Sequence, residues 1–189
     1  MIINEIKIDN FYCFINEVLI FKTGLNIISA KNGDGKSMLF NAFHWTLFNK
    51  LYIQTESGKK EWVNASREHV YPYKVEKESK IGDRFTSSVE LKILANFHEK
   101  SGDELVEYTF TKKVIYEKGE TEIITYQKAD LEISYVLNGE TKYIDSHLHN
   151  SVLDSIFPTT IRKFMWYQGE TMEELFDFSQ PSTLKYAIK

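Results

Sequence analysis

Apolar and polar residues near the N-terminus follow patterns that predict short strands and then a helix. Residues 1–8 alternate loosely between apolar and charged side chains, and Asp9 and Asn10 are expected to turn the chain. The apolar runs 18–21 and 25–29 predict two more strands, the second one buried and ending at a glycine-rich loop. Residues 38–48 carry apolar side chains on nearly every side, which predicts a helix buried on most faces.

The rest of the chain changes from an irregular pattern to a strongly alternating one. Residues 52–81 carry mixed charges without a clear period, which predicts a solvated surface excursion. Residues 85–144 alternate between apolar and polar side chains and predict an antiparallel meander of about four or five strands with an architectural role. A helix is expected over 146–157. The predicted class is α/β, with a mixed sheet and the meander packed around the first helix.

The composition is that of a globular chain with one core, or one domain with a substantial insertion. Of the 189 residues, 42% are apolar and 14% aromatic, which is too hydrophobic for a disordered chain. The formal net charge of −4 argues against a protein that coats nucleic acid by bulk charge. Cys13 is the only cysteine, so a reducing compartment is expected. Since no apolar run could span a bilayer and no signal peptide is visible, we expect a cytoplasmic protein without a membrane partner.

A phosphate-binding motif lies between the strand predicted over 25–29 and the helix predicted over 38–48. The pattern Gly-x4-Gly-Lys-Ser/Thr is present over residues 30–37, except that Ala30 replaces its first glycine. Gly33 and Gly35 can adopt positive φ and turn backbone N–H groups toward an anion. Lys36 and Ser37 supply the cation and the hydroxyl that such loops need. A strand before the motif and a helix after it favour nucleotide binding over a simple glycine-rich turn capped by Ser37.

A second candidate site comes near the end of the chain. The apolar, aromatic run 161–167 predicts a buried strand, and Gln168-Gly169-Glu170 follows it directly. Such a strand would bring two polar side chains to the rim of a sheet, where open α/β sheets bind ligands. The alternative is a strand-to-helix turn in which Glu170 or Thr171 begins the next helix. The residues alone leave both interpretations open.

Taken together, these motifs resemble a known family over nearly the whole chain. They are Ile-x-Ile-x-Asn-Phe at 6–11, Leu-Asn-Ile-Ile at 25–28, the phosphate loop, the meander, and Phe-Met-Trp-Tyr-Gln-Gly-Glu at 164–170. In this order they resemble the N-terminal half of an SMC-like, ABC-type ATPase head. That group includes double-strand-break-repair and chromosome-maintenance ATPases and DndD-like proteins of DNA phosphorothioation systems. The resemblance implies a P-loop NTPase N-lobe of the ABC type over residues 1–189.

The resemblance also assigns roles to individual residues. It implies that Lys36 contacts the β- and γ-phosphates of ATP and that Ser37 ligates Mg²⁺. Gln168 would be the catalytic glutamine that senses the metal and the attacking water. The amide cradle would be formed by Asn32, Gly33, Asp34 and Gly35. Many relatives carry a basic residue where Tyr12 and Cys13 stand in this chain.

Other parts of the family's catalytic machinery are absent from the sequence. We find no apolar run ending in Asp-Glu, as a Walker B motif requires, and no Ser-Gly-Gly signature. In the family these lie in a C-terminal lobe reached through a coiled coil, whose first turns residues 183–189 resemble. The implied partners are that lobe, a second head in a homodimer, DNA bound by the complete assembly, and a nuclease.

The resemblance implies an ATP-binding lobe that acts on DNA in repair, DNA modification or anti-phage defence. It would hydrolyse ATP only with the C-terminal lobe and after head dimerisation, because phosphoryl transfer depends on positioned groups. The alternative is a self-contained P-loop kinase or other NTPase. A third possibility, a module that has lost nucleotide binding, rests on Ala30.

Overall fold

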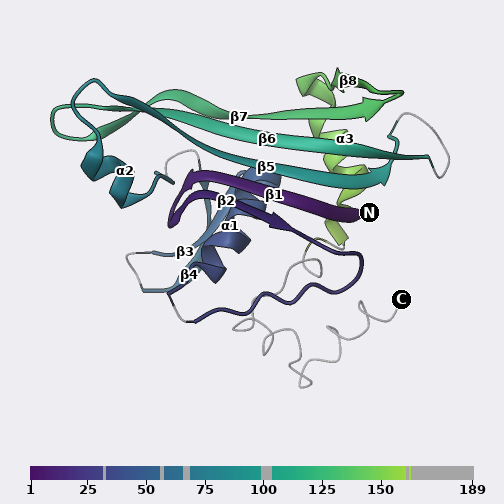
Figure 1. Ribbon diagram of the computed structural model, residues 1–189, viewed down its shortest axis with the longest axis horizontal. Coiled ribbons are helices and arrows are strands. Elements are labelled where there is room, and N and C mark those ends of the chain that lie inside the picture. Colours follow the sequence, from purple (N-terminus) through teal and green to yellow (C-terminus); the bar gives the residue numbers. More distant parts are fainter. Residues whose placement is uncertain (32, 56–57, 66–68, 99–103, 161, 163–189) are drawn as a thin grey trace. The chain divides into compact units, whose positions relative to one another are not determined.

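The computed structural model describes residues 1–31, 33–55, 58–65, 69–98, 104–160 and 162. The chain divides into two units, Met1–Ile156 and Phe157–Lys189. The first unit contains a six-stranded sheet with the order β2-β1-β5-β6-β7-β8 (Figure 1). Its strands are β1 (Ile2–Phe11), β2 (Phe14–Ile20), β5 (Arg84–Asn96), β6 (Leu105–Lys118), β7 (Ile123–Leu137) and β8 (Glu140–Tyr143).

The sheet is apolar on one face and polar on the other. Along β5, the side chains of Val89, Leu91 and Ile93 are buried, while Glu90 and Lys92 between them lie on the opposite face and are partly exposed. On that polar face the ammonium of Lys92 lies 2.9 Å from a carboxylate oxygen of Glu5 on β1. One buried and one solvated face is the usual arrangement of an antiparallel sheet. The alternation that predicted the meander therefore also identifies its core face.

The helix α1 (Lys36–Phe48) covers the apolar face of this sheet. It includes the whole predicted helix and begins two residues earlier. The ring of Trp45 is buried and packs against that of Phe11 on β1, with the ring centroids 5.1 Å apart. The prediction of burial on most faces is confirmed by the buried residues Leu39, Asn41, Ala42, Phe43, Trp45, Thr46 and Leu47.

The segment expected as a surface excursion contains regular structure. A hairpin of β3 (Lys50–Gln54) and β4 (Lys60–Asn64) follows α1, and the short helix α2 (Tyr73–Glu78) comes after it. The hairpin contributes Trp62, whose ring lies 4.5 Å from the ring of His44 and 5.7 Å from that of Phe40 on α1. These aromatic contacts dock the hairpin on the helix. No helix in the described part of the chain is both long and apolar enough to cross a membrane.

The strand predicted over 25–29 is wrong. These residues form no strand, and the side chains of Leu25 and Ile27 are 89% and 81% exposed. The Asn26 side chain instead bonds to backbone groups nearby, accepting from the N–H of Lys22 (3.0 Å) and donating to its carbonyl (2.8 Å). Such local bonds compete with a strand when no neighbouring strand offers a hydrogen-bond ladder. All strand pairs of the described residues are antiparallel, so the parallel part of the predicted mixed sheet is absent from them.

The turn predicted at Asp9 and Asn10 also lies elsewhere. Strand β1 continues to Phe11, and the chain reverses at Tyr12 and Cys13. Asn10 adopts a φ of 48° within the strand, and its side-chain amide donates to the carbonyl of Thr86 on β5 (3.1 Å). Asparagine tolerates this left-handed conformation well. The residue read as a turn signal is thus accommodated inside the strand.

The edge strand β8 covers only part of the longer strand β7. β8 pairs with Ser134–Leu137, so within the described residues the earlier part of β7 has no strand on its outer side. In that part the register between β6 and β7 shifts twice, between Lys113 and Ile115 and between Ile115 and Tyr116. Such shifts mark β-bulges, which bend a strand and increase its twist.

The helix predicted over 146–157 is present as the 3₁₀ turn η2 (Ser146–Leu148) and the helix α3 (His149–Ile156). In the second unit, residues 159, 160 and 162 are helical, and the N–H of Arg162 donates to the carbonyl of Pro158 (3.2 Å). The strand predicted over 161–167 is therefore wrong at Arg162. The helical turn begins near Pro158, and proline favours the first turn of a helix. The rest of that predicted strand, Gln168-Gly169-Glu170 and residues 183–189 lie outside the described residues.

Candidate functional site

The phosphate loop leads directly into α1, as its sequence pattern predicts. Gly33 and Gly35 have φ angles of 93° and 90°, in the left-handed region that glycine adopts without strain. Gly35 is the N-cap of α1, and its carbonyl accepts the N–H of Leu39 (2.9 Å). Two such residues within three positions curl the backbone before the helix starts. The two glycines of the motif are thus required by the loop's geometry.

Hydrogen bonds within the loop hold its shape. The Asp34 carboxylate accepts the N–H of Lys31 (2.8 Å), and the N–H of Asp34 donates to the carbonyl of Lys31 (3.2 Å). The Lys36 ammonium donates to the carbonyls of Ala30 (2.5 Å) and Lys31 (2.7 Å). An ammonium has three N–H donors, so this exposed cation can bind a further acceptor.

The start of α1 favours an anion. Its first turn contains no acidic residue, and its N-cap is a glycine without a side-chain hydrogen bond to the helix. The first N–H groups of a helix lack partners within it and carry partial positive charge. Ser37 lies in this first turn and is partly buried. The positive end of the helix, the Lys36 ammonium and the Ser37 hydroxyl therefore belong to one short segment.

The turn between β1 and β2 packs against the loop. A Cβ atom built on Gly35 would lie 2.5 Å from the sulfur of Cys13 and 3.3 Å from the ring of Phe14. Tyr12 has a φ of 50°, which is unusual for a bulky residue, and its N–H donates to the carbonyl of Val70 (2.6 Å). Partial burial raises the pKa of the Cys13 thiol. Cys13 and Phe14 thus supply a tight wall behind the phosphate loop.

Of the predicted site residues, Gly33, Asp34, Gly35, Lys36 and Ser37 form one continuous loop and helix start. Asn32 and Gln168 lie outside the described residues. The five described residues fit the phosphate groups of a nucleotide, with backbone donors, a lysine cation and a hydroxyl for a magnesium ion. Among the described residues, no cluster of three or more His, Cys, Asp or Glu side chains could hold a metal ion.

The family is shown by a sequence comparison. The family model of an AAA domain matches residues 5–183 of the chain. The chain belongs to this AAA-domain family. The family is one of SMC-like AAA ATPases, and membership of it implies nucleotide binding, typically with Mg²⁺. No curated protein sequence matches the chain.

The burial of two polar residues of the AAA domain, Lys112 and Asn41, was not predicted from the sequence. Lys112 on β6 is only 3% exposed, and burial lowers its pKa to about 8, although the charge of Asp130 opposes this shift. The signal was available, because Lys112 takes an apolar position in the alternation of Tyr108, Phe110 and Val114. Asn41 on α1 is fully buried, and no pattern distinguishes it from a solvated asparagine.

Proposed function

We propose that this AAA domain is the ATP-binding N-terminal lobe of an SMC-like ATPase head that acts on DNA, in repair, DNA modification or anti-phage defence. The phosphate loop carries this proposal. Its two left-handed glycines and the exposed Lys36 ammonium stand at the N-terminus of a helix that the sheet holds firmly. A loop of this kind binds a polyphosphate through backbone N–H groups and a lysine.

Each loop residue has a role in this proposal. The backbone of residues 32–35 and the N-terminus of α1 bind the phosphate oxygens. The Lys36 ammonium leaves the carbonyls of Ala30 and Lys31 and binds the β- and γ-phosphates instead. Ser37 and Gln168 would hold Mg²⁺, which neutralises phosphate charge when bound. Gln168 would also orient the attacking water. These residues bind and orient the nucleotide, and turnover then needs groups from a second lobe.

The surface upstream of the loop supports a partner lobe. Leu25, Ile27 and Ile28 are exposed, and they follow the exposed apolar residues Val18 and Ile20 of the edge strand β2. An exposed apolar run of this kind marks an interaction surface. We assign it to the C-terminal lobe, which would add a strand beside residues 25–29. Dimerisation with a second head, DNA binding and recruitment of a nuclease would be properties of that assembly.

Changing Lys36 to Ala in the complete head, meaning this chain with its C-terminal lobe, should abolish binding of a fluorescent ATP analogue. The matched control is Lys31→Ala, which removes an exposed lysine side chain and keeps the backbone hydrogen bonds of the loop. This control should bind the analogue like the wild type. Unchanged ATP affinity in Lys36→Ala would contradict the proposal.

The division into two lobes has its own test. ATP turnover should be absent from this chain alone and should appear when the C-terminal lobe is added. Ile27→Asp, which places a charge on the exposed run, should weaken association of the two lobes in analytical ultracentrifugation. Steady-state phosphoryl transfer by the chain alone would favour the alternative of a self-contained P-loop kinase or other NTPase.

A further inference from the structure

The helix α1 carries no polar stripe that would fix its orientation. Its buried side chains point in several directions, with Trp45 toward Phe11 of the sheet and Asn41 toward Tyr52 of the β3–β4 hairpin. Hydrophobic burial is not directional, so rotating or sliding a helix that is apolar on most sides changes its burial little. The phosphate loop is attached to this helix at Gly35. Directional contacts must therefore determine where the loop lies.

One directional contact comes from the β3–β4 hairpin. The fully buried Asn41 donates from its side-chain amide to the carbonyl of Tyr52 (3.1 Å) and accepts the N–H of Tyr52 on its side-chain oxygen (2.8 Å). Two opposed hydrogen bonds to one residue fix both the distance and the rotation of Asn41. Asn41 lies about one helical turn after Ser37. This contact therefore holds the middle of α1, about one turn from the phosphate loop.

The other directional contact comes from the six-stranded sheet. The buried Lys112 ammonium on β6 donates to the carbonyl of Trp45 (3.0 Å) and to the side-chain oxygen of Asn49 (2.7 Å). Asn49 is the left-handed C-cap of α1, and its carbonyl accepts the N–H of Ala65 after β4. A cation at a helix C-terminus is favourable for the helix dipole. This contact therefore holds the far end of α1.

We propose that Asn41 and Lys112 are positioning residues for nucleotide binding. Together they set the rotation and the axial position of α1, and so fix the place of Lys36 and Ser37 against the wall at Cys13. Buried polar groups can specify one arrangement of an otherwise apolar core. The expected effect on ATP affinity rests on the proposed function, whereas the expected effect on the contact between Gly35 and Cys13 does not.

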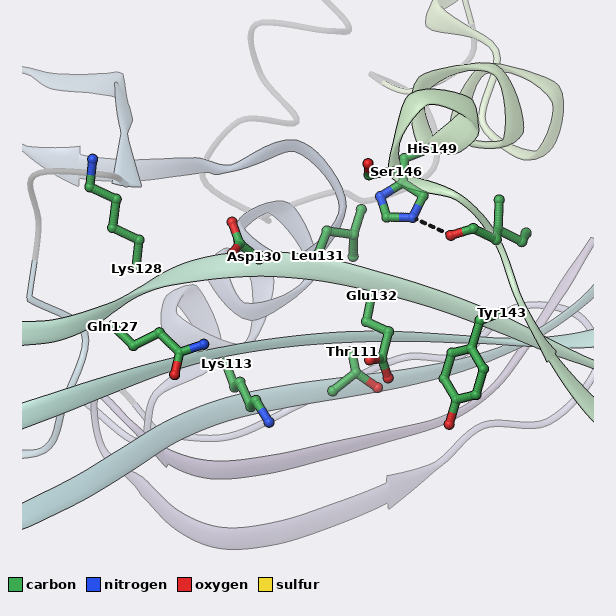
Figure 2. A pocket seen from close by; sticks show the side chains of 11 residues that line it. Thr111, Lys113, Gln127, Lys128, Asp130, Leu131, Glu132, Tyr143, Ser146 and His149 are labelled. Carbon is green, nitrogen blue, oxygen red and sulfur yellow. Dashed lines mark hydrogen bonds between the residues drawn. The ribbon is translucent and has the colours of Figure 1, made fainter.

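The test compares two neighbouring lysines in the complete head. Lys112→Met keeps the length of the side chain and removes its donors. Lys113→Met is the matched control, because Lys113 is exposed and lines a groove with Thr111 and Glu132 (Figure 2). Lys112→Met should weaken binding of a fluorescent ATP analogue by roughly tenfold, as expected when a hydrogen bond from a charged group is lost. It should also speed alkylation of Cys13 severalfold, measured by mass spectrometry, and Lys113→Met should change neither.

Asn41→Leu should give the same two effects, since it removes the other directional contact. Both measurements are made well below the unfolding transition. A residue that only stabilised the fold would lower the denaturation midpoint and leave alkylation and affinity at wild-type values. That result in Lys112→Met and Asn41→Leu would overturn the proposal, as would equal effects of the two lysine changes.

If Lys112→Met does not fold, a second variant tests the proposal. Asn49→Gly keeps the left-handed cap and removes only the side-chain acceptor of Lys112. It should speed Cys13 alkylation, and wild-type alkylation would overturn the proposal. If the wild-type head binds no nucleotide, the proposed function fails, whereas the alkylation measurements still decide whether these residues position α1.

Discussion

The two sides of the phosphate loop differ in what holds them. On the downstream side, α1 is packed against the sheet and the β3–β4 hairpin, and hydrogen bonds from both hold its middle and its C-terminal end. On the upstream side, the chain leaves the sheet after Phe21, and the Asn26 side chain organises an exposed turn. The helix side is complete within the described residues, whereas the strand side has its apolar residues exposed. A phosphate loop can thus be held in place by packing and hydrogen bonds on one side only.

The largest expected difference between the two sides is in core packing. Leu47 in α1 is 2% exposed and Leu25 is 89% exposed, so the same change can be made on each side. Leu47→Ala should lower the free energy of unfolding by about 2–5 kcal/mol, through lost burial and the cavity left behind. Leu25→Ala should change it by less than about 0.5 kcal/mol. Urea denaturation of both variants measures this, and equal losses would show that the upstream side is packed in solution.

The helix side should also depend on pH through His44. Burial between aromatic rings lowers its pKa from 6.5 to about 4, so the folded state binds this proton less readily than the unfolded state does. Its stabilising contribution is therefore complete above about pH 6.5 and is lost as the pH falls toward 4, by up to about 3 kcal/mol. His44→Phe should remove this dependence. Parallel denaturation profiles of wild type and variant between pH 4 and 7 would contradict it.

Within the loop itself, the two glycines should respond differently to the same change. Gly35→Ala combines strain at a positive φ with a Cβ 2.5 Å from the Cys13 sulfur, while a Cβ on Gly33 meets no atom within 4 Å. We expect Gly33→Ala to cost about 1 kcal/mol from backbone strain. Gly35→Ala should cost about 1–2 kcal/mol more, because overpacking adds to the strain. Thermal unfolding measures the stability of both variants. Equal losses of stability would show that the Cys13 side chain moves away from the added Cβ at no cost.

The smallest effect is expected for the turn on the upstream side. Asn26→Ala removes hydrogen bonds to the carbonyls of Lys22 and Gly24 and from the N–H of Lys22, all exposed to solvent. Because water replaces exposed hydrogen bonds, the loss should be less than about 1 kcal/mol. Amide hydrogen exchange of residues 22–29 should increase, while exchange within α1 should stay the same. Faster exchange in α1 would show that the two sides are coupled.

Sequence reasoning worked where local patterns decide the structure. The composition of residues 38–48 predicted a buried helix, and alternation over 85–144 corresponds to the strands β5 to β8. It failed where a distant partner decides. Residues 25–29 have strand composition, yet a strand forms only beside another strand. The phosphate loop was predictable because its glycines, lysine and serine act within a few residues of one another.

Other features could not be predicted because they join segments far apart in the chain. The contact of Cys13 with Gly35 depends on how the β1–β2 turn folds back, and no local signal in either segment shows it. Lys112 is different, since its place in an apolar alternation was visible. Its partners, Trp45 and Asn49, lie more than sixty residues earlier. The sequence could therefore mark Lys112 as unusual without showing what it holds.

The register shifts in β7 have a consequence for how the protein behaves at high concentration. A long strand edge without a neighbour is a template on which other chains can add strands, and this is a common start of aggregation. Over the part of β7 that β8 does not cover, the two shifts interrupt the regular spacing of backbone donors and acceptors. Lys128 and Asp130 add exposed charges there. The irregular strand thus protects the chain against growth into fibres.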